Sequence, residues 1–401
     1  MKNLLFIILG MLLLSCNIFD ISPEDEVKPE DIKDVAEMNQ SFAWDIFTQE
    51  IDAEQTKNVL ISPLSIQTAL SMALNGANGM TLEEMQEVLH CNACDLSALN
   101  IQQQKLILSL TKQSGHPEIR IANAYFYDPN RMVLKTSFEQ VLNEYYDCSF
   151  KKDDFNNEQK ALDNINSWVS NSTKGKIDKI LDEIGPLDVA FLINALYFKS
   201  DWAEGFAPEI SHLAPFTLSN GSTVSVMYVS GDRNVPHAAT SDFEMVDIPF
   251  RDSTYSLSLI QPAGDGSLNL LNRETYENLL GKLSYNRLYL TFPRLKLSYE
   301  NDLIASLKLL GMQAAFDGGK ADFKAMGTSS NNIYISQIKH KAVLEVDEKG
   351  AEGAAVTSIG FSNTSMPESM LFNKPFVLVL RHIESNTILF MGYIRNPKMT
   401  D

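Results

Sequence analysis

Residue types that commonly carry out catalysis or bind metals are present, but they do not form a recognised site. The chain has six histidines and four cysteines. Cys91 and Cys94 form one C-x-x-C pair beside His90, whereas a structural zinc site needs four ligands at suitable spacing. The sequence contains neither a G-x-S-x-G nucleophile elbow nor an H-E-x-x-H metal motif. We therefore expect no enzymatic activity, no metal and no cofactor, and we interpret Cys91 and Cys94 as a local disulfide or two free thiols.

A long segment near the C-terminus, residues 350–371, has a composition that suits movement rather than catalysis. Its residues are small and polar, and a loop of this length without its own element is uncommon in a compact domain and usually functional or disordered. A segment that has to enter between two strands needs small side chains, because larger ones would clash on entry. Before Val356 no bulky or β-branched residue occurs: the first six are Gly350, Ala351, Glu352, Gly353, Ala354 and Ala355.

The same segment alternates in the way a half-buried strand does. Successive side chains of a strand point to opposite faces of a sheet. One face would be small or apolar and would carry Ala351, Gly353, Ala355, Thr357, Ile359 and Phe361. The other would be mostly polar and would carry Glu352, Ala354, Val356, Ser358, Gly360 and Ser362. The pattern predicts a latent strand, and a flexible Gly/Ala linker is the alternative interpretation.

Helical patterns occupy the first half of the chain and strand patterns the second. Helices are predicted over 36–51, from Ser62 onward, where serine is a good N-cap, and from Thr81 with a capping box. The predicted strands are 121–127, 189–198, 245–249, 255–261, 287–293, 333–338, 342–346, 376–381 and 388–393. Because there is no βαβ rhythm and no linker, we predict a single α+β domain over residues 36–401.

The N-terminus has the features of an export signal. Residues 1–15 begin with a positive charge and contain an apolar run over 4–14, which is too short to span a bilayer. Ser15 directly before Cys16 resembles the bacterial lipobox, which predicts a lipidated Cys16 and a bacterial outer-membrane lipoprotein that is surface-exposed or periplasmic. An ordinary secretory signal with a coincidental cysteine is the alternative. Residues 16–35 are polar and acidic, and they are predicted to form a flexible tether.

Composition limits the partners that the protein can have. The hydrophobic fraction of 44% is enough for a sizeable core. The formal net charge is -18, which argues against nucleic acid and against heparin-like polyanions, because both need a basic surface. An acidic, self-repelling surface of this kind suits a monomer.

Short motifs spread over most of the chain occur in a fixed order. They are Asn58–Ile66, Asn166–Val169, Thr173–Ile177, Asn194–Lys199, Leu310–Phe316, Ala321–Phe323, His340–Ala355, Phe372–Phe376 and Leu389–Tyr393. In this order they resemble the serpin family of serine protease inhibitors, and the resemblance covers about residues 36–398. It implies three β-sheets, of which sheet A is the largest, with eight or nine helices. It also implies an exposed reactive loop between a strand ending near Glu348 and one beginning near Asn373.

The resemblance assigns roles to residues that control the opening of sheet A. Ser62, Ser65, Asn194 and His340 resemble a hydrogen-bonded cluster beneath the centre of the sheet, with Asn166 nearby. Each of these alone would more often be a satisfied core polar group. Glu348 and Arg294 resemble an ion pair at the point of insertion, with arginine in place of the commoner lysine, and Trp202 resembles the aromatic residue beside them.

The position of the cut also follows from the resemblance. Matching the family's loop length without a gap places the scissile bond between Thr364 and Ser365, sixteen residues after Glu348. A shift of one or two residues would put Asn363, Ser365 or Met366 before the cut. Threonine before the cut suits elastase-like or subtilisin-like proteases, which have shallow apolar pockets.

The mechanism that the resemblance implies is suicide-substrate trapping. A serine protease cuts the loop and forms an acyl-enzyme, and the freed loop then inserts as a new strand of sheet A. Ala351 replaces the usual threonine or serine of the hinge, and Gly353 replaces a frequent alanine. Neither change adds a proline or a charge that would prevent insertion. We therefore expect an inhibitory serpin, and a non-inhibitory serpin that acts as a binding module is the alternative.

Overall fold

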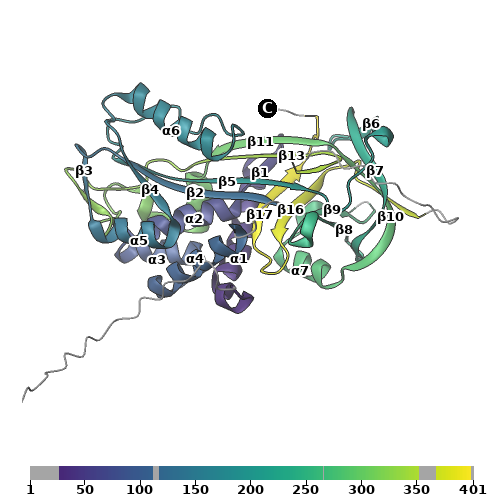
Figure 1. Ribbon diagram of the computed structural model, residues 1–401, viewed down its shortest axis with the longest axis horizontal. Coiled ribbons are helices and arrows are strands. Elements are labelled where there is room, and N and C mark those ends of the chain that lie inside the picture. The colour runs from purple at the N-terminus through teal and green to yellow at the C-terminus, as the bar shows by residue number, and fades with distance from the viewer. Residues whose placement is uncertain (1–26, 112–116, 265, 352–366, 399–401) are drawn as a thin grey trace, which may run out of the picture.

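The computed structural model describes residues 27–111, 117–264, 266–351 and 367–398. Within these ranges the chain forms eight α-helices and seventeen strands (Figure 1). The helices are α1 (Lys33–Ala53), α2 (Pro63–Leu74), α3 (Gly79–Val88), α4 (Leu96–Thr111), α5 (Thr136–Tyr146), α6 (Glu158–Ser172), α7 (Arg273–Gly281) and α8 (Ile304–Leu310). Five short 3-10 helices are η1 (Pro29–Ile32), η2 (Pro208–Ile210), η3 (Arg251–Ser253), η4 (Leu268–Leu270) and η5 (Ala314–Phe316).

The strands are grouped into four hydrogen-bonded sheets among the described residues. The nine-stranded sheet has the order β1 (Val59–Ile61), β17 (Ile388–Ile394), β16 (Phe376–His382), β9 (Tyr255–Pro262), β8 (Phe243–Pro249), β7 (Thr223–Ala239), β10 (Ser284–Pro293) and β15 (Glu368–Leu371), with β6 (His212–Thr217) paired to β7. The four-stranded sheet has the order β14 (Gly350–Ala351), β5 (Ala190–Asp201), β2 (Glu118–Tyr127) and β4 (Cys148–Lys152). Two pairs remain, β11 (Leu295–Asp302) with β13 (Lys339–Val346), and β12 (Gly327–Ser329) with β3 (Met132–Leu134).

The α+β architecture predicted from the sequence is confirmed, and the grouping of its strands differs from the three sheets expected. β13 has no ladder with β5 in the described residues, so the predicted sheet A consists of a four-stranded part and the β11–β13 pair. The nine-stranded sheet, rather than sheet A, is therefore the largest hydrogen-bonded sheet.

Helices cover the two faces of the divided sheet unequally. Figure 1 shows α1, α2 and α4 on one side of β2 and β5, and α6 alone on the other side. The large core lies on the first side, between these helices and the nine-stranded sheet. A smaller core lies under α6, where Ile165 and Val169 join Phe126, Phe191 and Ile193 of the two strands. α6 is amphipathic, and burial of this apolar face holds it against the sheet.

Two local sequence expectations have different outcomes. Ser62 caps α2 as predicted, because its side chain accepts a hydrogen bond from the backbone N–H of Ser65. The capping box at Thr81 is wrong: α3 begins at Gly79, and the Thr81 hydroxyl instead accepts the backbone N–H of Asp322 at 3.0 Å.

The folded domain begins before the predicted boundary at residue 36. Pro29–Ile32 forms η1 and α1 begins at Lys33, so residues 29–35 of the predicted tether 16–35 are helical. Ile32 and Val35 are buried in the large core, which a tether would not allow. Residues 1–26, which include Cys16, lie outside the described residues. Among the residues described, no helix is both long and apolar enough to cross a bilayer.

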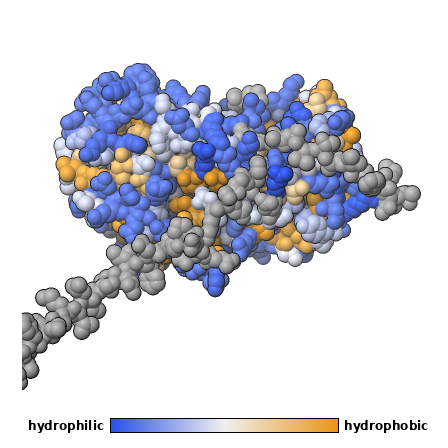
Figure 2. Space-filling model, viewed as in Figure 1, coloured by the Kyte–Doolittle hydropathy of each residue, from blue (hydrophilic) through white to orange (hydrophobic). Residues whose placement is uncertain are grey.

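The visible surface is mostly hydrophilic. Figure 2 shows small hydrophobic patches separated by hydrophilic residues. This pattern agrees with a net charge of -18 and with the normal distribution of apolar side chains on a folded protein.

Candidate functional site

The most unusual feature of the fold is a slot between two strands that run through its centre. In the described residues β5 and β13 have no ladder with each other; at one end, which we call the upper end, β14 pairs antiparallel with β5 through Gly350 with Asp201 and Ala351 with Ser200. Below this point lies a cavity of about 200 Å³, lined by residues 189–196 on one side and 331–342 on the other. We refer to this space between β5 and residues 331–346 as the slot.

A tight turn at the top of β13 sends the chain back down into the slot. The backbone N–H of Asp347 donates to the carbonyl of Gly350 at 3.0 Å, and the Asp347 carboxylate accepts the backbone N–H of Lys349 at 2.8 Å. Gly350 has a φ of +152°, and a Cβ there would lie 2.1 Å from the carbonyl oxygen of Ser200. Glycine is therefore required for β14 to approach β5. Ala351, which follows, is only 1% exposed.

Glu348 is buried and anchors this turn through an ion pair with Arg294, whose side chain is partly exposed, so the two residues that the resemblance paired are in contact. Its carboxylate lies 2.5 Å from the Arg294 guanidinium and accepts a hydrogen bond from the Ser211 hydroxyl at 2.5 Å. Burial alone would raise the pKa of Glu348, but the hydrogen bonds from Arg294 and Ser211 outweigh it and lower the pKa below its ordinary value. Glu348 is therefore charged at neutral pH and holds the turn in place.

Trp202 packs against the turn, at the position where the resemblance placed an aromatic residue. Its indole N–H donates to the carbonyl of Asp347 at 2.9 Å, and its backbone N–H donates to the carbonyl of Lys349 at 2.7 Å. Its ring stacks on Phe250, with the centroids 4.6 Å apart and an interplanar angle of 9°. The upper end of the slot is thus closed by the Glu348–Arg294 ion pair, by the stacking of Trp202 on Phe250, and by the two hydrogen bonds that Trp202 donates to backbone carbonyls.

The first turn of α2 lies beneath the slot and is hydrogen-bonded to both of its edges. The backbone N–H of Ser62 donates to Nε2 of His340 on β13 at 3.1 Å. The Ser65 hydroxyl donates to the side-chain oxygen of Asn194 on β5. Asn194 in turn donates to Asn123 on β2 at 2.7 Å. Four of the predicted residues therefore meet here, and α2 connects two strands that do not pair with each other.

His340 accepts rather than donates at Nε2, which requires the neutral imidazole. It is only 6% exposed. Burial lowers its pKa to about 4, so the ring is neutral at physiological pH. Its bond to Ser62 is therefore intact under ordinary conditions.

Asn166, which the resemblance placed near this cluster, makes its hydrogen bonds to other residues. It lies on α6, on the opposite face of the sheet. Its side-chain oxygen accepts the backbone N–H groups of Ile180 at 2.8 Å and Leu181 at 3.0 Å, and its amide donates to the carbonyl of Leu181 at 2.9 Å. The residues that a helix presents to its neighbours depend on tertiary packing, so the sequence alone did not indicate these partners.

The chain that follows α6 covers the slot, and we refer to residues 173–182 as the crossing segment. Ile180 and Leu181 line the cavity. Lys176 pairs with Glu345 of β13 at 3.0 Å, and Asp178 lies 3.6 Å from Lys341 of β13. Sequence reasoning missed these ion pairs, because nothing in the local sequence indicates which strand the segment crosses.

The predicted strand 333–338 is wrong. Residues 332–338 have no ladder, because β11 ends opposite Lys339 on one side and the slot lies on the other. They are held instead by isolated contacts, among them the backbone N–H of Ile335 to the carbonyl of Ala315 at 2.9 Å. A strand pattern without a neighbour gives an extended but unpaired segment.

Several predicted site residues lie outside the described residues. They are Glu352, Gly353, Ala354 and Ala355 of the hinge, the scissile pair Thr364 and Ser365, and the lipidation site Cys16. Cys91, Cys94 and Cys148 are free thiols in this structure, and Cys91 and Cys148 are buried. Within the described part of the chain, no group of three or more His, Cys, Asp or Glu side chains could hold a metal ion.

Comparisons with known proteins agree with one another. The sequence model of the family described as Serpin (serine protease inhibitor) matches residues 37–397. Serpin B8 of Homo sapiens is 30% identical over 378 residues, which cover 91% of this chain and 100% of that protein. The thermophilic serpin Tengpin in its native state has a TM-score of 0.84 and 28% identity, covering 91% of this chain and 94% of that chain. Thyroxine-binding globulin in complex with thyroxine has a TM-score of 0.82 and 27% identity, covering 91% of this chain and 100% of that chain.

Proposed function

Because this chain belongs to the serpin family, we propose that it inhibits serine proteases by trapping them after they cut its loop. The serine of the protease attacks the carbonyl of Thr364 and forms an ester. The Thr364–Ser365 peptide bond breaks, and the new amine of Ser365 takes a proton from the protease's general acid. The freed loop enters the slot as a strand before water can hydrolyse the ester.

The observation that carries the proposal is the position of Gly350 and Ala351. These two residues already pair with β5 inside the upper end of the slot, and below them β5 and β13 have no ladder in the described part of the chain. Strand addition needs a strand edge that has no ladder partner, and among the described residues β5 has no strand paired along the slot beyond Ala351. Ordered pairing at Gly350 thus gives the loop its starting register.

Continuing that register gives each later residue a defined partner. Gly350 faces Asp201 and Ala351 faces Ser200, so Glu352 would face Lys199. Opposite charges directly across a strand pair are favourable. Thr357 would face Asn194, where the α2 cluster lies. The small, apolar face of the loop would then lie against the large core, and its polar face would lie under α6.

Insertion would also move the protease. About sixteen residues at roughly 3.3 Å each correspond to about 50 Å of strand. A protease attached at Thr364 would be carried across the molecule, and its active site would be pulled out of shape. Loss of a single oxyanion-hole donor slows acyl transfer by about 10²–10³-fold, so the ester persists.

Threonine at the cut and the absence of Lys and Arg from 350–371 support an elastase-like or subtilisin-like target. The test is to mix equimolar protein with elastase and, separately, with trypsin. We expect an SDS-stable covalent complex with elastase and none with trypsin. Mass spectrometry of the released fragment would identify the cut bond. A stable complex with trypsin alone would overturn the specificity, and no complex with any serine protease would overturn the inhibitory function.

A binding module without inhibitory action is the alternative function. The similarity to thyroxine-binding globulin solved with thyroxine is the observation that favours it. Such a protein would be cut by elastase as an ordinary substrate. Catalytic turnover of the loop with no adduct would therefore support the alternative.

We also propose that the protein acts as a monomer anchored to a bacterial outer membrane through a lipid on Cys16. The lipobox-like Ser15–Cys16 sequence supports this. Anchoring would place the inhibitor where foreign proteases arrive. We expect Cys16→Ser to release the protein from the membrane fraction without loss of inhibition. Retention of the variant in membranes would contradict the proposal.

A further inference from the structure

The lower end of the slot, opposite Gly350, is closed by a polar contact between its two edges. Asp188 lies in the turn just before β5. Its carboxylate accepts a hydrogen bond from the Ser336 hydroxyl at 2.7 Å and, more weakly, from the Gln337 amide at 3.4 Å. Ser336 and Gln337 precede β13. These bonds therefore connect the two edges of the slot, at the end opposite Gly350.

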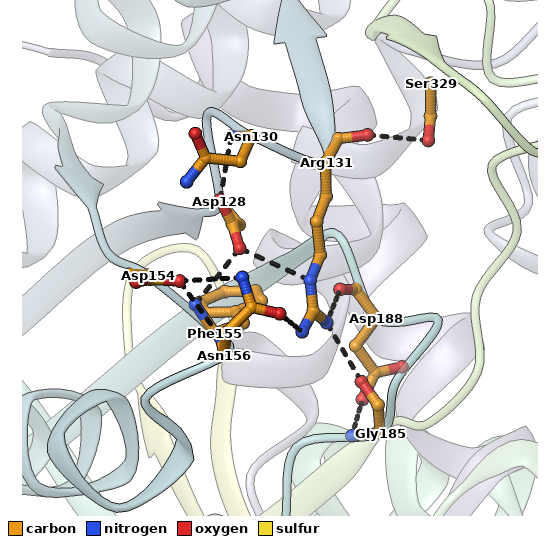
Figure 3. A network of polar contacts seen from close by, with 9 residues as sticks. All are labelled: Asp128, Asn130, Arg131, Asp154, Phe155, Asn156, Gly185, Asp188 and Ser329. Carbon is orange, nitrogen blue, oxygen red and sulfur yellow. Dashed lines mark hydrogen bonds and ion pairs between the residues drawn. The ribbon is translucent and has the colours of Figure 1, made fainter.

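The turn that holds Asp188 is fixed from its other side. Figure 3 shows Arg131 pointing into this turn, where its guanidinium donates to the carbonyls of Asp188 at 2.8 Å and Gly185 at 3.1 Å. The same guanidinium lies 3.3 Å from the carboxylate of Asp128, which is fully buried. The Asp188 carboxylate also accepts the backbone N–H of Gly185 at 2.8 Å. Asp188 is thus presented to Ser336 by a rigid network, because each of its neighbours is itself bonded.

From this geometry we propose that Asp188 is a positioning residue, which latches the lower end of the slot in the intact protein and releases it when insertion is complete. The inference rests on the proposed function, since it assigns a step of loop insertion to this contact. Strands in a sheet lie about 4.8 Å apart, so two strands that flank an inserted strand are about 9.6 Å apart. The short side chains of Asp188 and Ser336 meet at 2.7 Å and cannot bridge that separation.

The register at the top of the slot indicates when the latch has to open. Gly350 faces Asp201 and Ala351 faces Ser200, so the residue that would face Asp188 is Asn363. This position directly precedes Thr364. The loop can therefore fill most of the slot with the latch closed, and only the last step, which completes the movement of the protease, separates Asp188 from Ser336.

The test uses a double variant, Ser336→Ala with Gln337→Ala. It removes both donors on the β13 side and leaves the Asp188 turn and its Arg131 bonds in place. Ser222→Ala is the matched control, because its exposed hydroxyl also makes one 2.7 Å bond, to the Asn220 side chain, in the turn between β6 and β7 rather than across the slot. Each protein is melted intact and after a single elastase cut in the loop.

The double substitution is expected to destabilise the intact form and not the cleaved form. The double variant should melt about 2–4 °C below wild type when intact and at the wild-type temperature when cleaved, because the cleaved form has already lost the bond. The control should shift both forms equally. An equal shift in both forms of the double variant, or no shift in the intact form, would overturn the latch. Failure of the proposed function is distinguishable, because wild type itself would then gain no stability on cleavage.

Discussion

At the scale of single residues, closure of the slot depends on a few short contacts along its edges. Gly350 is the clearest, since a Cβ would lie 2.1 Å from the Ser200 carbonyl oxygen. The ion pair of Glu348 with Arg294 and the bond of His340 with Ser62 act beside it. Each of these contacts holds a strand edge rather than a reacting atom.

We predict that Gly350→Ala destabilises the intact protein by about 1–3 kcal/mol, because the added Cβ separates β14 from β5 and strains the backbone. The yield of covalent complex should fall as well, since insertion loses its starting register. Gly281→Ala is the control, because a Cβ there would have no neighbour within 4 Å. Thermal melts and SDS gels check both effects, and equal behaviour of the two variants would count against the role of Gly350.

His340 makes stability depend on pH. Burial lowers its pKa to about 4 from an ordinary 6.5, so the folded protein keeps it neutral where the unfolded chain binds a proton. Its contribution is complete above about pH 6.5, is lost as pH falls towards 4, and amounts to about 3 kcal/mol. Burial also lowers the pKa of His382, so its protonation should destabilise the fold over the same range of pH.

We therefore expect the melting temperature of wild type to fall between pH 6.5 and pH 4. The fall should be shallower in His340→Gln, whose amide oxygen can still accept the Ser62 N–H but which binds no proton in this range. Melting curves at several pH values check this. Parallel curves for the two proteins would show that protonation of His340 does not weaken the slot.

The sequence predicted single residues well where a motif carried them and poorly where packing decided their partners. Ser62, Ser65, Asn194 and His340 meet as expected, because each lies within a recognisable motif. Asn166, expected near them, bonds instead to Ile180 and Leu181 of the crossing segment. Asp188 and Ser336 were not singled out, since they are 148 positions apart and neither position shows an unusual pattern.

At the scale of elements, the slot is held closed from both faces of the sheet. The first turn of α2 connects its edges on one face. The crossing segment, residues 173–182, covers it on the other face through Lys176 and Asp178. An inserting strand has to displace the crossing segment, so the hold of α6 on that segment should set how readily the slot opens.

We predict that Asn166→Ala speeds entry into the slot, because it removes the three hydrogen bonds that hold Ile180 and Leu181 to α6. A synthetic peptide with the sequence of residues 350–363 is the probe, and its uptake is followed by the rise in melting temperature. Asn164→Ala is the control, since this residue lies on the same helix and bonds to Asp153 instead. Uptake at the same rate in both variants would contradict the role of the crossing segment.

Elements were predictable from the sequence where a helix or strand has neighbours on the expected side. The α+β order and most strands follow from hydrophobic periodicity. Residues 333–338 have the pattern of a strand but no partner, because whether β5 pairs with them is a property of the whole sheet. The same absence of pairing creates the slot, so this wrong prediction coincides with the candidate functional site.

At the scale of the whole molecule, the described residues leave β5 and β13 without a shared ladder, on the two sides of a cavity of about 200 Å³. One end of the slot is closed at Gly350 and the other end at Asp188. α2 and the crossing segment span the slot on its two faces. These contacts are modest compared with a full strand ladder. The proposed trapping mechanism requires the intact protein to be metastable, that is, held by the rate at which the slot opens rather than by the lowest free energy.

The measurement that tests this most directly is the melting temperature of the wild-type protein before and after one cut in residues 352–366. A filled slot would add about ten ladder hydrogen bonds, each worth about 1 kcal/mol. At about 2 °C per kcal/mol, the cleaved protein should melt about 20 °C higher than the intact one. A cleaved protein that melts at the same temperature as the intact protein, or below it, would show that the loop does not enter the slot.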